Sequence, residues 1–186
     1  MFKVFFYFFS LIFLLGCSKD PCEKVVCQNG GYCANGSCVC PEGYTGADCS
    51  QQKTPSIIYI TRIDLIQTPP FTPTGDFWDN GEGTGFSLAD PYLDLSLGGV
   101  LISSTDFKTD ISSSQLSTYT LPSPIMISSP NARHTIYVWD YDDLGTDDYM
   151  GGIEFSPYSS TNRFPSSQLL SVGEISVRLY YTYVWQ

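Results

Sequence analysis

The sequence predicts a mainly β protein, with a small disulfide-rich hairpin module followed by an antiparallel sandwich. Three observations lead to this fold class. Six cysteines fall within residues 22–49, apolar and polar residues alternate over much of residues 56–186, and no helical period follows residue 16. Short strands separated by Gly, Pro, Ser and Asp are typical of a sandwich of about eight strands.

Residues 1–16, MFKVFFYFFSLIFLLG, contain one lysine followed by an apolar run that is too short to span a bilayer comfortably. This layout predicts a secretory signal peptide. The chain has seven cysteines, so Cys17 is left over if the other six pair with one another. An ordinary signal peptide cut nearby would leave Cys17 as a free thiol.

The sequence Leu14-Leu15-Gly16-Cys17 resembles the lipobox of bacterial lipoprotein signals. The resemblance implies cleavage before Cys17 and acylation of that cysteine, so that residues 17–21 form a lipidated tether. A cysteine carrying more than one acyl chain is stably anchored, whereas a single chain is marginal. Ser18, rather than Asp, follows the cysteine, and by the same resemblance this favours the outer membrane of a bacterial cell envelope.

Residues 22–49, CEKVVCQNGGYCANGSCVCPEGYTGADC, hold six cysteines but no apolar run long enough to form a core. A segment this small generally needs covalent cross-links to hold a fold. Zinc is the competing use of clustered cysteines, but paired C-x2-C knuckles are missing and the only histidine, His134, is far along the chain. Six cysteines allow 15 pairings, so spacing alone does not fix the disulfides.

The end of this segment, Cys38-x-Cys40 followed by Gly43-Tyr44, Gly46 and Cys49, resembles an EGF-like module. The resemblance implies the disulfide pairs Cys22–Cys33, Cys27–Cys38 and Cys40–Cys49. Calcium-binding members of that family carry an acidic pattern before the first cysteine, where this chain has Pro21. We therefore expect residues 22–49 to be a rigid spacer, joined by a polar linker, residues 50–55, to the larger domain.

Strands are expected in residues 56–186 wherever apolar side chains recur with a period of two. Leu93, Leu95 and Leu97 share one face of a strand, and residues 175–183 show the same period over a longer stretch. Shorter strands are expected at residues 57–66, 100–103, 124–128, 135–139 and 152–156.

The charge of the chain excludes one class of partner. The net charge is −10, and the nine Lys and Arg residues are scattered singly, so nothing resembles the basic surface that nucleic-acid binding requires. No second apolar stretch is long enough to cross a membrane. We therefore expect any membrane attachment to come from the lipid on Cys17.

The candidate functional residues of the larger domain lie in two acidic stretches, residues 75–96 and residues 138–152. In the second, Asp140, Asp142 and Asp148 follow a D-x-D-x5-D spacing between two expected strands. A loop there can direct three carboxylates at one point, and Ca²⁺ accepts about six to eight oxygen ligands in irregular geometry, whereas Mg²⁺ demands a stricter octahedron. Converging carboxylates without a cation would repel one another and raise each other's pKa.

The segments VWDYDDLGTDDYMG and ADPYLDLS resemble the calcium loops of C2 domains, and the order of motifs is similar over residues 56–186. The resemblance implies an eight-stranded C2-like sandwich that binds Ca²⁺ and docks onto phospholipid head groups through the ion. The first-loop ligand is Asp79 or, in an alternative register, Asp76, because the interval to Asp90 is longer than is usual in that family. The implied calcium ligands are Asp79, Asp90, Asp140, Asp142 and Asp148.

Aromatic and apolar residues near these loops have two interpretations. Phe77, Trp78 and Leu144 lie in the loops and can be apolar tips that touch a membrane or partner, although Trp78 is expected in the core. Trp139 and Tyr149 are expected in the core as well. His134, which precedes a strand without a metal-binding neighbour, is expected at the surface or in a turn.

Recognised catalytic motifs are missing from the sequence. It has no G-x-S-x-G elbow, no His-Glu-x-x-His helix and no phosphate-binding G-x-x-x-x-G-K, and a metal loop explains the Asp cluster better than a carboxylate pair does. The sequence therefore predicts a surface lipoprotein that is not an enzyme. We expect calcium-dependent adhesion to an anionic membrane, lipopolysaccharide or a protein partner. The alternatives are a calcium-independent structural or interaction subunit and a carbohydrate-binding sandwich with Trp78 and tyrosines stacking on sugars.

Overall fold

The computed structural model describes residues 19–79, 88–143 and 145–185. These residues form strands, turns and loops without a helix, and among them no helix is long and apolar enough to cross a membrane. The expected signal peptide, Cys17, Ser18 and Leu144 lie outside the described residues. The described residues divide into two compact units, one with residues 19–41 and 45–50, the other with residues 42–44, 51–79, 88–143 and 145–185.

The first unit contains a hairpin of β1 (Tyr32–Ala34) and β2 (Ser37–Val39). Asn35 and Gly36 join the two strands with φ angles of 52° and 83°, and a two-residue hairpin turn with positive φ at both positions is the one that Asn-Gly favours. β3 (Tyr44–Thr45) and β4 (Gln51–Gln52) form a second two-stranded sheet.

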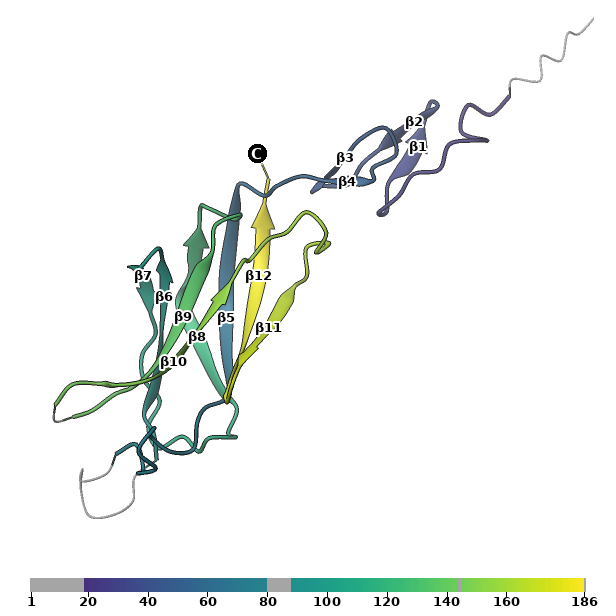
Figure 1. Cartoon of the computed structure of the whole chain (residues 1–186). Helices are drawn as coiled ribbons and strands as arrows, with labels where there is room; N and C mark the ends of the chain where they lie inside the picture. Colours follow the sequence, from purple (N-terminus) through teal and green to yellow (C-terminus); the bar gives the residue numbers. More distant parts are fainter. Residues whose placement is uncertain (1–18, 80–87, 144, 186) are drawn as a thin grey trace, which may run out of the picture. The chain divides into compact units, whose positions relative to one another are not determined.

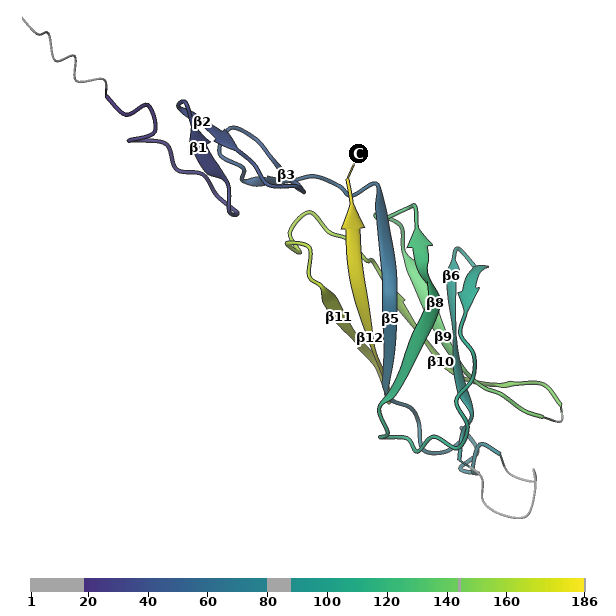
Figure 2. The same ribbon diagram turned by 180° about the vertical axis from the view of Figure 1, so that it is seen from behind.

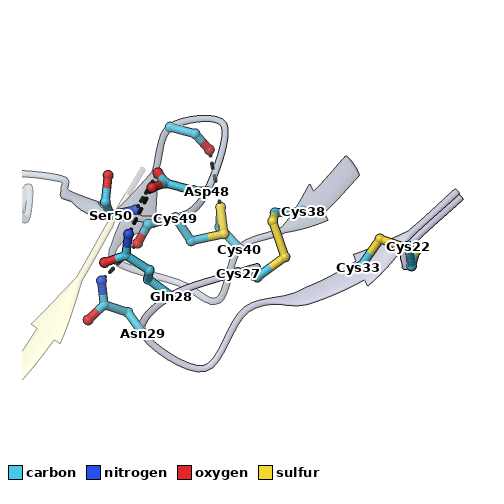
Figure 3. The surroundings of a disulfide bond; sticks show 11 residues. Cys22, Cys27, Gln28, Asn29, Cys33, Cys38, Cys40, Asp48, Cys49 and Ser50 are labelled. Atoms are coloured by element: carbon cyan, nitrogen blue, oxygen red, sulfur yellow. Dashed lines mark hydrogen bonds between the residues drawn. A yellow bond between two sulfur atoms is a disulfide. The ribbon is translucent and has the colours of Figure 1, made fainter. Parts of the chain in front are cut away.

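Three disulfides hold the cysteine-rich segment together: Cys22–Cys33, Cys27–Cys38 and Cys40–Cys49 (Figure 3). These are the pairs that the EGF-like resemblance implies. Hydrogen bonds tie the last loop to the start of the hairpin, because Gln28 Nε2 donates to Asp48 Oδ2 at 2.8 Å and Asn29 Nδ2 donates to the Cys49 carbonyl at 2.8 Å. At Gly31 a Cβ atom would lie 2.7 Å from the Cys49 sulfur, so the disulfide packs against bare backbone.

The second unit contains two four-stranded antiparallel sheets, drawn from the front in Figure 1 and from behind in Figure 2. One sheet has the order β10-β9-β6-β7 and the other has the order β11-β12-β5-β8. The strands are β5 (Ile57–Gln67), β6 (Pro91–Leu97), β7 (Val100–Ser104), β8 (Ser117–Ile127), β9 (His134–Asp140), β10 (Asp148–Phe155), β11 (Ser167–Val172) and β12 (Ile175–Val184).

Alternating side chains build the core between these sheets. In β9, residues 134, 136, 138 and 140 are buried, while residues 135, 137 and 139 are half-buried and point to the opposite face. His134 is therefore buried, with 1% of its surface exposed, and the expectation of a surface or turn position was wrong. Its Nδ1 lies 3.0 Å from the Ala132 carbonyl, and burial lowers the pKa of the ring.

The described loops after β5, before β6 and between β9 and β10 lie at one end of the sandwich (Figures 1 and 2). The chain enters β5 at Ile57, at the opposite end, where β12 also finishes because Ile57 pairs with Val184. Asp79, Asp90 and the end of β9 at Asp140 therefore lie at the end of the sandwich that is remote from the point of entry.

Candidate metal site

Three of the predicted ligands converge at this loop end. Asp79, Asp140 and Asp142 each offer a carboxylate oxygen, and these oxygens lie within 4.8 Å of one another. Asp79 and Asp140 are buried, with 5% and 0% of their surfaces exposed, and Asp142 is half-buried. Asp79 follows β5, whereas Asp140 ends β9 and Asp142 lies in the loop after it, so the fold brings Asp79 next to two carboxylates that are far from it in the sequence.

Strand pairing positions Asp140. It is the last residue of β9 and continues the buried face of that strand. Its Oδ1 accepts a hydrogen bond from the Asp90 backbone N–H at 2.5 Å. Its Oδ2 is buried and has no hydrogen-bond partner among the described residues. A buried carboxylate oxygen without a partner carries a desolvation cost that a cation or a proton can offset.

Burial, followed by the charges of Asp79, Asp142 and Asp90, raises the pKa of Asp140 to about 7, against the lowering effect of the Asp90 backbone hydrogen bond. The carboxylate group thus competes for a proton near neutral pH when no cation is present. A divalent cation at this position would favour the ionised carboxylate instead.

A second layer of contacts orders the loop between β9 and β10. The Asp147 carboxylate accepts hydrogen bonds from the Asp142 backbone N–H at 3.3 Å and from the Tyr92 hydroxyl at 2.7 Å. Burial and this contact with Asp147 raise the pKa of Tyr92, so the hydroxyl remains a donor. Tyr92 belongs to β6, so this contact joins the start of that strand to the loop between β9 and β10.

The remaining predicted ligands lie outside the group of three. Asp90 precedes β6, and one of its oxygens accepts the Asp110 backbone N–H at 2.7 Å. Asp148 begins β10 with an exposed side chain. Asp76 is exposed and accepts a hydrogen bond from the Thr74 hydroxyl at 2.9 Å. Asp79, and not Asp76, therefore belongs to the converging group, which contains three of the five carboxylates predicted.

The aromatic residues near the loops also differ from expectation in part. Trp78 is buried and its indole N–H donates to the Pro69 carbonyl at 2.8 Å, as a core residue. Phe77 is half-buried and packs edge-on against Phe71. Tyr149, in contrast, is 51% exposed. Trp139 is half-buried and lies on the outer face of its sheet. The expectation that Tyr149 and Trp139 belong to the core was wrong.

Oxygen ligands identify the class of metal that fits. The converging group contains carboxylates and neither histidine nor cysteine, and such hard ligands suit Ca²⁺, Mg²⁺ or Mn²⁺ rather than zinc or copper. Loop carboxylates at unequal depths favour the irregular coordination of calcium. The residues present therefore fit a hard divalent cation.

The chain resembles known proteins in both of its parts. A family model described as EGF-like domain matches residues 17–49. A search of curated proteins finds no match to the chain.

Among solved structures, a C2 domain is 13% identical, with a TM-score of 0.45, 69% of this chain covered and 97% of that one. Human GIVD cytosolic phospholipase A2 is 15% identical, with a TM-score of 0.47, 72% of this chain covered and 18% of that one. A C2 domain of plant extended synaptotagmin 1 is 14% identical, with a TM-score of 0.37, 72% of this chain covered and 100% of that one. The predicted architecture, a small disulfide-rich hairpin module followed by an eight-stranded antiparallel β-sandwich, is confirmed.

Proposed function

We propose that the sandwich binds calcium through Asp79, Asp140 and Asp142. The observation that carries the proposal is the buried Oδ2 of Asp140, which lacks a hydrogen-bond partner among the described residues and belongs to a residue with two further carboxylates nearby. A divalent cation offsets both the desolvation of this oxygen and the repulsion between the three carboxylates. The loop position and exclusively oxygen ligands support calcium over softer metals.

Calcium held in this way is suited to docking. Three protein carboxylates leave coordination positions for further oxygens, since calcium takes about six to eight. Phosphate or carboxylate oxygens on an anionic surface can fill those positions. The chain itself carries a net charge of −10, so the ion supplies the positive charge that an anionic membrane, lipopolysaccharide or acidic protein partner requires. The function is calcium-dependent adhesion.

The rest of the chain serves attachment in this proposal. Cys17 carries the lipid anchor in the bacterial envelope, at the outer membrane, and the disulfide-linked module is a spacer between the anchor and the sandwich. The role is binding rather than catalysis. The location of the carboxylates at the end of the sandwich remote from Ile57 supports this arrangement, because the chain enters at the other end.

A calorimetric titration tests the proposal. Calcium is titrated into residues 18–186 and into the double variant Asp140→Asn, Asp142→Asn, with Asp143→Asn as the matched control from the same loop. We expect saturable binding that the double variant loses and the control keeps. Sedimentation with vesicles of phosphatidylserine or phosphatidylcholine, in calcium or in EGTA, then tests docking.

Absence of heat and of thermal stabilisation up to several millimolar calcium would refute calcium binding, since extracellular sites of this class bind in the range of about 10⁻⁴ to 10⁻³ M. The sandwich would then be a calcium-independent structural or interaction subunit, whose loop carboxylates hold a proton in place of the ion. Calcium binding without attachment to vesicles would keep the site and direct the search to lipopolysaccharide or a protein partner.

A further inference from the structure

A groove lies beside the metal site, between the loop of residues 72–78 and the start of β10. It is an open depression of about 520 Å³, a volume within the range of about 300 to 1,000 Å³ that small-molecule sites occupy. Polar and aromatic side chains line it together, among them Thr74, Asp76, Asp148 and Tyr149. The two carboxylates that the metal site leaves out, Asp76 and Asp148, thus face a common space.

One wall of the groove is an ordered loop. The Thr72 N–H donates to the Asp76 carbonyl at 2.9 Å, and the Asp76 N–H donates to the Thr72 hydroxyl oxygen at 3.2 Å. The hydroxyl oxygens of Thr72 and Thr74 are 2.9 Å apart, and the Thr74 hydroxyl donates to Asp76 Oδ2 at 2.9 Å. These bonds fix two hydroxyls and a carboxylate in one chain of polar groups, so a ligand would find them already positioned.

The other wall of the groove carries an exposed aromatic ring, Tyr149, which packs against two further aromatic rings. Tyr149 is 51% exposed, and its ring centre lies 5.2 Å from that of Trp139 and 6.2 Å from that of Tyr137. A β-bulge follows Tyr149, where the register shifts before Gly151, and such bulges redirect side chains. At Gly152 a Cβ atom would lie 3.0 Å from both Tyr137 and the Tyr149 hydroxyl, so this glycine gives the rings their room.

We infer that this groove binds a neutral saccharide, which stacks on Tyr149 and hydrogen-bonds to Asp76 and Asp148. A pyranose ring has apolar C–H faces that suit an exposed aromatic ring and a rim of hydroxyls that act as both donors and acceptors. Carboxylates accept hydrogen bonds from sugar hydroxyls, and the remaining lone pairs of the Thr72 and Thr74 hydroxyl oxygens can accept them as well. The two negative charges exclude phosphate and acidic sugars, because like charges repel.

An organic cation has donors only and would match the same acceptors, so the test includes a cationic probe that separates it from a sugar. The site is separate from the calcium group, because neither carboxylate belongs to the three that converge. Saccharide binding can therefore be tested independently of calcium binding.

A glycan array tests the inference with the full chain labelled by a fluorophore. Immobilised neutral and acidic oligosaccharides are probed in calcium and in EGTA, together with an oligolysine peptide as a cationic probe. We expect one or more neutral glycans to bind in both buffers. Tyr149→Ala should weaken that binding at least about tenfold, and Asp76→Ala should weaken it to a similar degree, because both remove central contacts. Tyr149→Phe, which keeps the ring, should remain within about threefold of the unmodified chain.

Three results would overturn the inference. The first is no binding to any neutral glycan by the folded chain. The second is glycan binding that needs calcium and is unaffected by Tyr149→Ala, which would place the sugar at the ion. The third is binding to oligolysine alone that Asp76→Ala removes, which would make the groove a site for cations. Circular dichroism spectra of the variants that match the unmodified chain exclude unfolding as the cause of a loss.

Discussion

Replacing Asp140 by asparagine should stabilise the calcium-free sandwich at pH 8. The pKa of Asp140 rises from 3.8 to about 7 in the fold, and each pKa unit corresponds to about 1.4 kcal/mol, so its ionised form lowers the free energy of unfolding by at most about 4 kcal/mol. Asparagine removes the charge, while its Oδ1 can still accept the hydrogen bond from the Asp90 N–H.

The sign of the pH dependence distinguishes this cause from others. Because the folded-state pKa is above the unfolded value, the folded chain binds more protons between about pH 4 and pH 7, and its free energy of unfolding falls as pH rises through that window. The gain from Asp140→Asn should therefore be absent near pH 4 and complete above about pH 7. Urea unfolding in EGTA, monitored at several pH values, measures it.

Calcium should narrow the difference in stability between the two proteins. At a free calcium concentration about 100 times its dissociation constant, the unmodified chain gains about 2.7 kcal/mol, whereas the variant gains little. Asp143→Asn, from the same loop but outside the converging group, should keep the gain from calcium. A variant that is less stable than the unmodified chain in EGTA at pH 8, or that gains equally at pH 4, would refute the electrostatic argument.

Three further predictions concern other residues. Burial lowers the pKa of His134 below its ordinary 6.5, so the unfolded state binds more protons than the folded state as pH falls below that value. The urea midpoint of the Asp140→Asn variant, in which Asp140 no longer titrates, should therefore decline between pH 7 and pH 5. Adding His134→Phe should flatten this decline. Tyr92→Phe removes the hydrogen bond to Asp147 and should weaken calcium binding about two- to tenfold by calorimetry, from a loss of about 0.5 to 1.5 kcal/mol, with an unchanged calcium affinity contradicting a positioning role. Cells fed labelled palmitate should label the chain at Cys17 and lose the label in Cys17→Ser, with the labelled protein in the outer-membrane fraction; an unlabelled chain or inner-membrane recovery would contradict the anchor.

The alternation of apolar and polar residues predicted the strands that have one buried and one exposed face. Residues 57–66 and 175–183 alternate because each strand has a buried face, and both are central strands of the observed sheet. β11, an edge strand, was missed, since its adjacent Leu169 and Leu170 break the period. β8 is longer than predicted because Pro122 interrupts the pattern, and an edge strand tolerates proline.

Loop sequence predicted the site less completely than it predicted the strands. Spacing could place Asp140 and Asp142 in one loop, but the choice between Asp79 and Asp76 depends on how the chain folds across space. The burial of His134 had a detectable signal, because it shares the period-two face of Ile136 and Val138. Alternation also puts Trp139 on the opposite face, but it does not reveal whether another layer covers that face.

The placement of the chain's entry and the carboxylates at opposite ends of the sandwich has a mechanical consequence. β5 alone spans 11 residues, on the order of 35 Å at the usual rise of a strand. A pull between an anchored N-terminus and a docked calcium loop would act along the strand axes. The hydrogen bonds between β5 and its neighbours β12 and β8 would then share the load in shear instead of opening one at a time.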